Sequence, residues 1–409
     1  MTPLFRKFLG MHWILFAAMA MLLASGVYAI YAAVHFRDGE EAHLVDTWHK
    51  QINWILIGTV AYFSAALVDY KWVRWGAVIM YVISLGLVAA VFKFGHSEEV
   101  HGQLLSLRLP GIGAFQPAQL AIASTILLMA VVLGEAHKIF PWMRHYMVRF
   151  LVSGAIFGLP FLLMLKQGDL GSAMVIVPVA VVMLIVGNIP FRCLIAAALV
   201  GLTVIPPVYF FGLKEHQRQR IDVTIDLLRG KEVNVKGEGW ALTNILIAVG
   251  SAGWEGKGMD TKQLAPNLKN LLQLRLLPNE TMHNDFIYTV VCETFGFRGA
   301  GALLALFLFL LVMCFTVAFF ARDALGRLIV AGIIALLFAH TFEHIGMNLG
   351  ILPITGIPLP FISYGGTFLT MTMFLMGLLQ SVWVHRNKML EEEAARRPAL
   401  SPRSAPALA

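Results

Sequence analysis

Long apolar stretches recur along almost the whole of this 409-residue chain. Each holds roughly 18 to 24 residues, enough for a helix to cross a hydrocarbon core of about 30 Å. Because 58% of the residues are hydrophobic and 13% are charged, with a mean hydropathy of +0.74, a water-soluble globule is excluded. The sequence predicts an all-α integral membrane protein with about ten transmembrane helices, at residues 13–34, 52–70, 73–94, 117–137, 147–166, 171–188, 190–213, 297–321, 327–350 and 361–385.

Lysines and arginines near the ends of these stretches gather on one side. Ten spans put both termini on a single side, and the positive-inside rule makes that side the cytoplasm. The first span lacks a small-residue cleavage site, so we expect a retained helix rather than a signal peptide. The cations that set this orientation are Arg6, Lys7, Lys71, Arg74, Lys138, Arg144, Arg149, Arg192, Arg322, Arg327, Arg386 and Lys388.

A segment from about residue 214 to residue 284 separates the seventh and eighth predicted spans. It exceeds the roughly 60 residues to which the positive-inside rule applies, so its own cations do not oppose the topology. Its apolar residues at helical spacing predict a large structured extracytoplasmic loop. Residues 1–390 then form one polytopic membrane domain. Residues 391–409, rich in Ala, Pro and charge, are expected to be a disordered cytoplasmic tail.

The net charge of +7 does not indicate a nucleic-acid-binding protein. Its cations are divided between the inner membrane face and the outer loop, with no basic domain that also carries aromatic stacking residues. Anionic lipid is the better partner for them. The chain has no G-x-S-x-G, no C-x-x-C and no Walker P-loop. Its cysteines, Cys193, Cys292 and Cys314, fall in or beside predicted spans and indicate small buried apolar residues.

Asp285 stands where a polar segment gives way to an apolar one, in LPNETMHNDFIYTVVCETFGFRG at 277–299. Local sequence supports two interpretations equally. Either Asn284 and Asp285 cap the helix that follows, or Asp285 is a water-accessible functional group at the membrane border. Glu293 lies on nearly the same helical face, a little over two turns deeper. Because an acid at that depth needs a polar partner, a structural ion pair or a hydrogen bond between helices is favoured there over catalysis.

Charged residues of the outer connections also have two interpretations. Lys166 and Asp169 in KQGDLGS are three residues apart, and a local salt bridge that holds the turn is favoured over a pair facing an outer cavity. The loop cations indicate either a solvated or headgroup-binding surface or recognition of a phosphate or pyrophosphate. They are Arg218, Arg220, Lys257, Lys262, Lys269 and Arg275.

His340, Glu343 and His344 fit H-x-x-E-H, the spacing of zinc-binding helices. No third ligand is evident in this membrane span, so we expect a polar helix face, continued by Asn348, in the outer half of the bundle. The next segment, GILPITGIPLPFISYGGT at 350–367, is rich in proline and glycine. Such backbone cannot pair its own polar groups, so we expect it to wall a cavity on the outer side.

Several stretches carry a resemblance that covers nearly the whole chain in order. They are GIGAFQPAQLA at 111–121, KQGDLGSA at 166–173, HQRQRI at 216–221, AVGSAGWEGKG at 248–258, HNDFIY at 283–288, E-x-x-G-F-x-G at 293–299 and FEHIGMNLGILPITGIPLPFISYGG at 342–366. Together they resemble the SEDS family (shape, elongation, division and sporulation) of bacterial cell-wall polymerases. The TGIPLP wording and the short N-terminus resemble the elongation branch of that family.

The resemblance implies a peptidoglycan glycosyltransferase of the bacterial cytoplasmic (inner) membrane, with its active site on the outer face. It implies polymerisation of lipid II during cell elongation and shape maintenance, alongside a class B penicillin-binding protein as transpeptidase partner. In the family the acid of the H-x-D-F-I motif is the catalytic residue, which here is Asp285. Converting an α-linked lipid pyrophosphate into a β-1,4 linkage by inversion needs only one displacement and one general base.

The resemblance also implies a set of substrate-binding residues. Either cations of this set or a divalent cation such as Mg²⁺ or Mn²⁺ would neutralise the leaving pyrophosphate, and no protein metal site is expected. The set consists of Lys166, Asp169, Gln217, Arg220, Lys257, His283, Glu343, Ser363 and Tyr364.

This chain departs from the family pattern at several places, among them a stretch that follows the third span. Where the family reads QPSELAK, residues 116–122 read QPAQLAI, so Gln119 and Ile122 replace an acid and a lysine. Two alternatives to an enzyme stay open. A lipid II flippase or transporter would need polar residues through the full thickness of several spans, and a non-catalytic scaffold for a class B penicillin-binding protein is favoured slightly by the lost pair.

Overall fold

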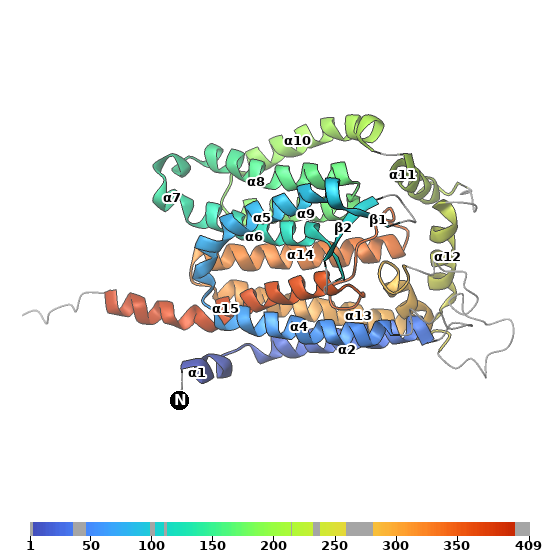
Figure 1. The fold of residues 1–409 in the computed structure, drawn as a ribbon, viewed down its shortest axis with the longest axis horizontal. Coiled ribbons are helices and arrows are strands. Elements are labelled where there is room, and N and C mark those ends of the chain that lie inside the picture. The colour runs from blue at the N-terminus through green and yellow to red at the C-terminus, as the bar shows by residue number, and fades with distance from the viewer. Residues whose placement is uncertain are drawn as a thin grey trace, which may run out of the picture.

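The computed structural model describes residues 3–35, 46–98, 103–109, 113–213, 215–231, 238–258 and 281–396. The protein is mostly helical, and its long helices run side by side (Figure 1). Within the described residues a helix coincides with each predicted span: α2 (Trp13–His35), α4 (Thr47–Leu67), α5 (Val73–Phe94), α6 (Pro117–Gly134), α8 (Tyr146–Gln167), α9 (Leu170–Val186), α10 (Phe191–Pro207), α13 (Ile287–Phe320), α14 (Ala324–Asn348) and α15 (Gly366–Arg396).

Eight candidate membrane spans are long and apolar enough to cross a bilayer among the described residues. They coincide with α2, α5, α6, α8, α10, α13, α14 and α15. The helix α9 has only 17 residues, and α4 begins with the polar stretch Thr47-Trp-His-Lys-Gln. The protein is therefore a mostly helical chain with eight candidate spans.

A small antiparallel sheet departs from the predicted all-α fold. It has the order β1-β2-β3 and joins α5 to α6, with Ser97 opposite Leu104 and Arg108 opposite Ala114. The alternation of Leu with other residues in QLLSLRL suits a strand, but the run is too short to stand out beside membrane spans. The strands are β1 (His96–Glu98), β2 (Gln103–Leu109) and β3 (Gly113–Phe115).

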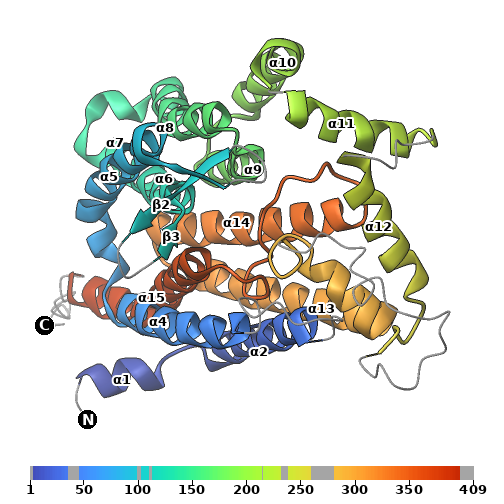
Figure 2. The same ribbon diagram turned by 45° about the vertical axis from the view of Figure 1, so that its right-hand side comes forward.

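Short helices lie at the two ends of the bundle. At one end are α1 (Pro3–Leu9), η1 (Tyr70–Trp72), α7 (Ala136–Ile139) and η2 (Pro141–Arg144). At the other end are α11 (Glu215–Leu228) and α12 (Glu238–Ser251), which belong to the predicted outer loop; the five-residue η3 (Val208–Gly212) leads from α10 toward them. Figure 2 shows α11 and α12 far from α1 and α7.

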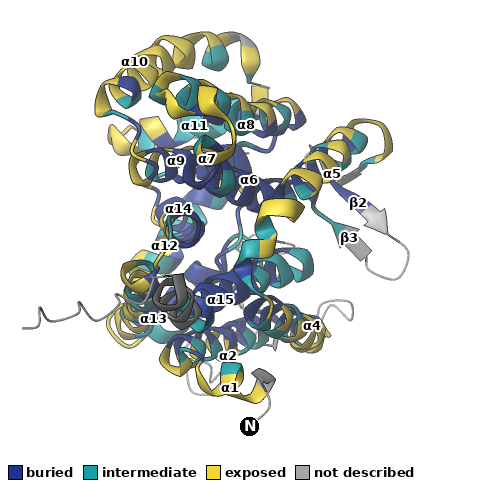
Figure 3. Ribbon diagram, turned by 90° about the vertical axis from the view of Figure 1, so that its left-hand side faces the viewer, coloured by how far each residue is buried: buried dark blue, intermediate teal, exposed yellow. Residues whose placement is uncertain are grey.

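The helices α6 and α14 form the centre of the bundle. In the most apolar window of each helix, 89% of the α6 residues and 78% of the α14 residues are buried, against 6% for α10. Figure 3 shows α6 and α14 in the buried colour and α10 mostly exposed at one edge. A helix that is buried all round suits the core of a large membrane bundle, and an apolar helix exposed all round suits contact with lipid.

The C-terminal segment differs in part from its prediction. Helix α15 continues to Arg396, so residues 391–396 are helical rather than disordered. Glu, Ala and Arg in EEEAAR are strong helix formers and extend the helix that precedes them. Residues 397–409 lie outside the described residues.

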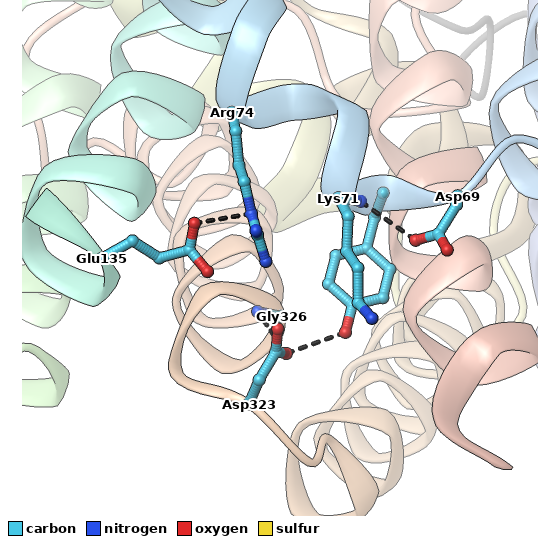
Figure 4. A network of polar contacts seen from close by, with 7 residues as sticks. Asp69, Lys71, Arg74, Glu135, Asp323 and Gly326 are labelled. Carbon is cyan, nitrogen blue, oxygen red and sulfur yellow. Dashed lines mark hydrogen bonds and ion pairs between the residues drawn. The ribbon is translucent and has the colours of Figure 1, made fainter. Parts of the chain in front are cut away.

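A polar network joins the turns at the α1 end (Figure 4). Arg74 Nε pairs with Glu135 Oε2 at 2.6 Å, which ties α5 to the end of α6. The hydroxyl of Tyr70 donates to Asp323 Oδ1 at 2.8 Å, and the same oxygen accepts from the backbone N–H of Gly326 at 3.0 Å. The start of α14 is therefore fixed to η1 by one carboxylate.

Small residues allow α4 and α15 to pack closely. A Cβ atom at Gly377 of α15 would overlap the carbonyl oxygen of Tyr62, and one at Gly58 of α4 would overlap the sulfur of Met373. Close approach of backbones at small residues is a main source of helix association in membranes.

We expect Gly377→Ala to destabilise the protein by about 1–3 kcal/mol, because the added methyl must push α4 and α15 apart. The thermal unfolding midpoint in detergent measures this change. Gly154→Ala in α8 is the matched control, since no atom lies within 4 Å of a Cβ there, and it should not lower the midpoint. Equal effects of the two substitutions would contradict the role of close packing at Gly377.

Candidate active site

Asp285 lies in a turn over residues 281–286 that leads into α13. Its backbone N–H donates to Thr281 O at 2.7 Å, and its side chain is half-buried. The N-cap position of α13 is occupied by Phe286, which makes no side-chain capping bond. Neither Asn284 nor Asp285 therefore stands at the N-cap, which disfavours the capping alternative.

Ser363 and Tyr364 hold this turn from the segment between α14 and α15. Ser363 Oγ donates to Asn284 O at 2.6 Å and accepts from Leu359 N at 2.8 Å. Tyr364 N donates to His283 O at 2.9 Å, and the rings of His283 and Tyr364 are 5.5 Å apart. The structure thus brings three predicted site residues, His283, Ser363 and Tyr364, next to Asp285 as supports of its backbone.

Asn348 at the end of α14 joins two helices beneath the same turn. Its Nδ2 donates to Asp285 O at 3.1 Å and to His344 O at 2.8 Å. Its Oδ1 accepts from the hydroxyl of Thr289 at 2.6 Å and from the backbone N–H of the same residue at 3.3 Å. Sequence reasoning placed Asn348 on the polar face of α14 but did not include it among the site residues.

The irregular segment 354–357 passes directly beside the Asp285 carboxylate. Gly356 has φ +73°, and a Cβ atom there would lie 3.4 Å from Asp285 Oδ2. Arg220 Nη1 of α11 donates to Ile354 O at 3.4 Å. A Cβ at Gly171 of α9 would lie 3.1 Å from Thr355 O. The segment rich in proline and glycine therefore connects Asp285 with α9 and α11, as a wall of this region.

Asp169 is buried at the start of α9 and belongs to the neighbouring part of the site. Its Oδ1 accepts from Ser172 N at 3.0 Å, and its Oδ2 accepts from Gln116 Nε2 at 3.4 Å. Burial raises the pKa of this carboxyl, while the hydrogen bonds from Ser172 and Gln116 act in the opposite direction. Gln217 Nε2 of α11 reaches the adjacent Gly168 O at 2.9 Å.

Lys166 does not pair with Asp169. It is exposed, and its ammonium lies 5.6 Å from the ring centroid of Phe92. The salt bridge favoured by the sequence is therefore wrong, because Asp169 turns inward to cap α9 while Lys166 points outward. Gln119 and Ile122, which replace an acid and a lysine of the family pattern, are both buried in α6.

The polar face predicted for α14 is buried within the protein. His340, Glu343 and His344 are each at most 4% exposed. His344 Nδ1 donates to Ile357 O at 2.7 Å, and His340 Nδ1 donates to Leu336 O at 3.1 Å. Each ring therefore donates a hydrogen bond to a backbone carbonyl. Among the residues that the structure describes, no group of three or more His, Cys, Asp or Glu side chains could hold a metal ion.

The segment of residues 252–258, which follows α12, clasps α13 at a kink. Gly296 interrupts α13 with φ +64°, ψ −161°, and faces Gly256, which has φ +80°. Backbone N–H groups then donate in both directions, from Lys257 to Glu293 O at 2.8 Å and from Phe297 to Gly253 O at 3.0 Å. A Cβ atom at Gly256 or Gly296 would overlap the opposite backbone, so only glycine permits this clasp.

A buried ion pair completes the clasp. Lys257 Nζ lies 3.0 Å from Glu293 Oε1, with side chains 9% and 0% exposed. The structural ion pair predicted for Glu293 is confirmed, and its partner is a cation that we also considered for pyrophosphate. A second pair, Arg298 with Glu255 at 2.9 Å, joins the same segments at the exposed surface. The loop cations Lys262, Lys269 and Arg275 lie outside the described residues.

These elements define a polytopic membrane protein in which one acid-bearing turn is enclosed by irregular backbone between its last two long helices. A family model described as a cell cycle protein, FtsW/RodA/SpoVE, matches residues 12–388. The chain belongs to this family.

Characterised relatives agree along most of their length. The chain is 30% identical over 374 residues to peptidoglycan glycosyltransferase MrdB of Escherichia coli K12, covering 91% of this chain and 94% of the relative. It is 31% identical over 366 residues to a probable peptidoglycan glycosyltransferase FtsW of Geobacter metallireducens, covering 88% and 91%.

Solved structures show the same fold. A chain from a structure described as structural coordination of polymerization and crosslinking by a peptidoglycan synthase complex superposes with a TM-score of 0.73 at 24% identity, covering 92% of this chain and 98% of that chain. The crystal structure of the Thermus thermophilus rod shape determining protein RodA superposes with a TM-score of 0.62 at 24% identity, covering 92% and 97%.

We expect Glu293→Gln to destabilise the protein by about 3–5 kcal/mol, because it leaves the Lys257 ammonium buried without its counterion. Chemical unfolding in detergent, followed by tryptophan fluorescence, measures the change. Glu255→Gln removes the exposed pair between the same two segments and should cost at most about 1 kcal/mol. Similar losses in the two variants would show that burial of the Lys257 pair adds nothing.

Proposed function

We propose that this protein is a peptidoglycan glycosyltransferase that polymerises lipid II, with Asp285 as the general base. The observation that carries the proposal is the placement of the Asp285 carboxylate in a turn whose backbone is held by Asn348, Ser363 and Tyr364. Its Oδ2 lies 3.4 Å from the point that a Cβ atom at Gly356 would occupy. The names of the curated relatives support the reaction class. A half-buried carboxylate on a fixed backbone can accept a proton while still being reachable by a substrate.

The reaction needs one proton transfer and one displacement. Asp285 takes the proton of the acceptor sugar hydroxyl, the hydroxyl oxygen forms a bond to the anomeric carbon of the donor, and the bond from that carbon to the lipid pyrophosphate breaks. A single displacement inverts an α linkage to β, giving the β-1,4 link. The leaving pyrophosphate keeps the bonding electrons and requires positive charge near it.

Arg220 is the cation that we assign to the pyrophosphate. It extends from α11 to the Ile354 carbonyl in the segment that borders Asp285, and its planar fork suits phosphate oxygens. Lys257 is already paired with Glu293, and Lys166 points outward over Phe92, so we assign neither to this role. Gln217 and Asp169 shape the neighbouring α8–α9 turn, and Glu343 belongs to the buried face of α14.

A divalent cation such as Mg²⁺ or Mn²⁺ is proposed only as an ion carried by the pyrophosphate. The described residues offer no three-ligand set for it, so no step of the reaction is derived through it. Magnesium commonly binds through one or two carboxylates together with substrate phosphates, and its affinity here would depend on the bound substrate.

The proposed topology has ten spans, with α4 and α9 added to the eight candidates, and both termini in the cytoplasm. It places the loop of residues 214–284, which contains α11 and α12, outside the inner membrane together with the turn that carries Asp285. Residues 1–390 then form one membrane domain. We propose a class B penicillin-binding protein as partner, because a structural neighbour comes from a peptidoglycan synthase complex.

We expect Asp285→Asn to lower lipid II polymerisation at least about a hundredfold, because the amide cannot accept the proton. Glycan strands made by purified protein with its partner are measured on gels. Asp226→Asn removes an exposed carboxylate of α11 that pairs with Lys231, and it should keep the wild-type rate. Undiminished polymerisation by Asp285→Asn would refute the general base.

The same preparations separate the enzyme from its alternatives. Translocation of lipid II across vesicles without any polymer would indicate a flippase or transporter. Partner binding with no polymerisation by the wild type would indicate a scaffold. Either outcome would replace the proposed activity.

We expect Gly356→Ala to reduce polymerisation by about tenfold or more, because the methyl group would fill the space beside Asp285 Oδ2 at van der Waals contact and hinder a substrate hydroxyl that approaches the carboxylate there. The initial rate is compared with that of Gly230→Ala. Gly230 also has a positive φ, +70°, but no atom lies within 4 Å of its Cβ position, so the backbone strain is matched while the contact is absent. If both variants lose activity equally, the contact with Asp285 is not the cause.

A further inference from the structure

A cluster of cations lies at the α7 end of the bundle, opposite α11 and α12 (Figure 1). It consists of Lys138 in α7, Arg144 in η2 and Arg149 in α8, around the imidazole of His137. Burial lowers the pKa of His137, and the charges of Arg149, Lys138 and Arg144 lower it further.

The carboxylate that acts on His137 already forms an ion pair with another residue. Glu135 is the acid that acts on His137, but its carboxylate pairs with Arg74 at 2.6 Å. The described residues around the ring therefore hold a surplus of positive charge.

Two nitrogen atoms of the cluster are buried without a hydrogen-bond partner in the described part of the chain. They are Nε of Arg149 and Nδ1 of His137. Arg149 Nη1 donates to Gly187 O at 3.4 Å, and its Nε takes no part in that hydrogen bond. A buried guanidinium donor without an acceptor is unusual in folded proteins, and phosphate oxygens are its favoured acceptors.

The elements that carry the cluster also bear exposed apolar side chains. Arg192 at the start of α10 donates to the Tyr146 hydroxyl of α8 at 2.8 Å and lies 5.1 Å from that ring, which brings the two helix starts together. Large exposed apolar side chains belong to α8, to α10 and to residues 139–142 of the preceding segment: Ile139, Phe140, Trp142, Leu151, Phe191 and Ile195. A phosphate at the cluster would therefore have acyl-chain surfaces on α8 and α10 next to it.

We propose that this cluster binds the phosphate of an anionic phospholipid, phosphatidylglycerol, whose acyl chains lie along α8 and α10. A free phosphate would satisfy the cations but would leave the adjoining apolar side chains uncovered. A lipid satisfies both, and aromatic residues such as Trp142 favour the boundary between headgroups and chains. That the lipid belongs to the cytoplasmic leaflet rests on the proposed topology, but its binding does not depend on the proposed reaction.

Native mass spectrometry of the full-length protein in detergent tests the proposal. Dioleoyl phosphatidylglycerol, dioleoyl phosphatidylcholine and inorganic phosphate are titrated separately. We expect the glycerol lipid to bind more tightly than the choline lipid, and inorganic phosphate at the same concentration not to displace it. Equal binding of the two lipids, or displacement by inorganic phosphate, would overturn the proposal.

Matched variants locate the site. Arg149→Gln and Arg144→Gln should each weaken binding of the glycerol lipid by about fivefold, the contribution of one cation near a membrane surface. Arg327→Gln removes an exposed cation at the start of α14, at the same end of the bundle, and should leave binding unchanged. Equal weakening by Arg327→Gln would mean that diffuse charge, and not this cluster, attracts the lipid.

A folding control keeps the result interpretable. The thermal unfolding midpoint of each variant is measured without added lipid. Arg144 is exposed, so its variant should unfold like the wild type even if Arg149→Gln does not. Unchanged lipid binding by a folded Arg144→Gln variant would contradict the proposed position of the headgroup.

Discussion

Irregular backbone at the end of a membrane bundle has to satisfy its polar groups within the protein, and this constraint shapes the region around Asp285. The segment between α14 and α15 and the turn before α13 meet this constraint by hydrogen-bonding to each other. Ser363 and Tyr364 bond to the carbonyls of Asn284 and His283, and Asn348 bonds to the carbonyl of Asp285. The groups that complete the hydrogen bonding of the backbone are the same ones that fix the position of the carboxylate.

The second organising feature is the clasp between residues 252–258 and α13. Two glycines in left-handed conformations let the backbones meet, and the Lys257–Glu293 pair is buried beneath them. Breaking such a pair on one side is costly, because the remaining charge stays in a poor solvent. The kink therefore joins residues 252–258 to the helix whose first residues follow Asp285.

Sequence reasoning recovered the helices and the pairing of Glu293 but not the direction of Lys166. Apolar length and charge distribution are properties of each segment, so the bounds of α5 could be read directly, and those of α14 to within three residues. The salt bridge expected between Lys166 and Asp169 relied on their spacing alone. It failed because Asp169 caps α9 and accepts from Gln116, which belongs to a distant part of the chain. The small sheet was missed because its strands are short beside the spans.

The sequence by itself determined that this chain is a helical membrane protein, which residues carry the family motifs and that an acid stands at the border of α13. Those conclusions follow from hydropathy and from motifs, which depend on local order. Only the tertiary structure decided that Gly356 and Asn348 adjoin Asp285, and that Lys257 is paired with Glu293. These contacts join residues 36 to 71 positions apart, so their partners are chosen by packing and by the need to satisfy buried polar groups rather than by neighbouring sequence.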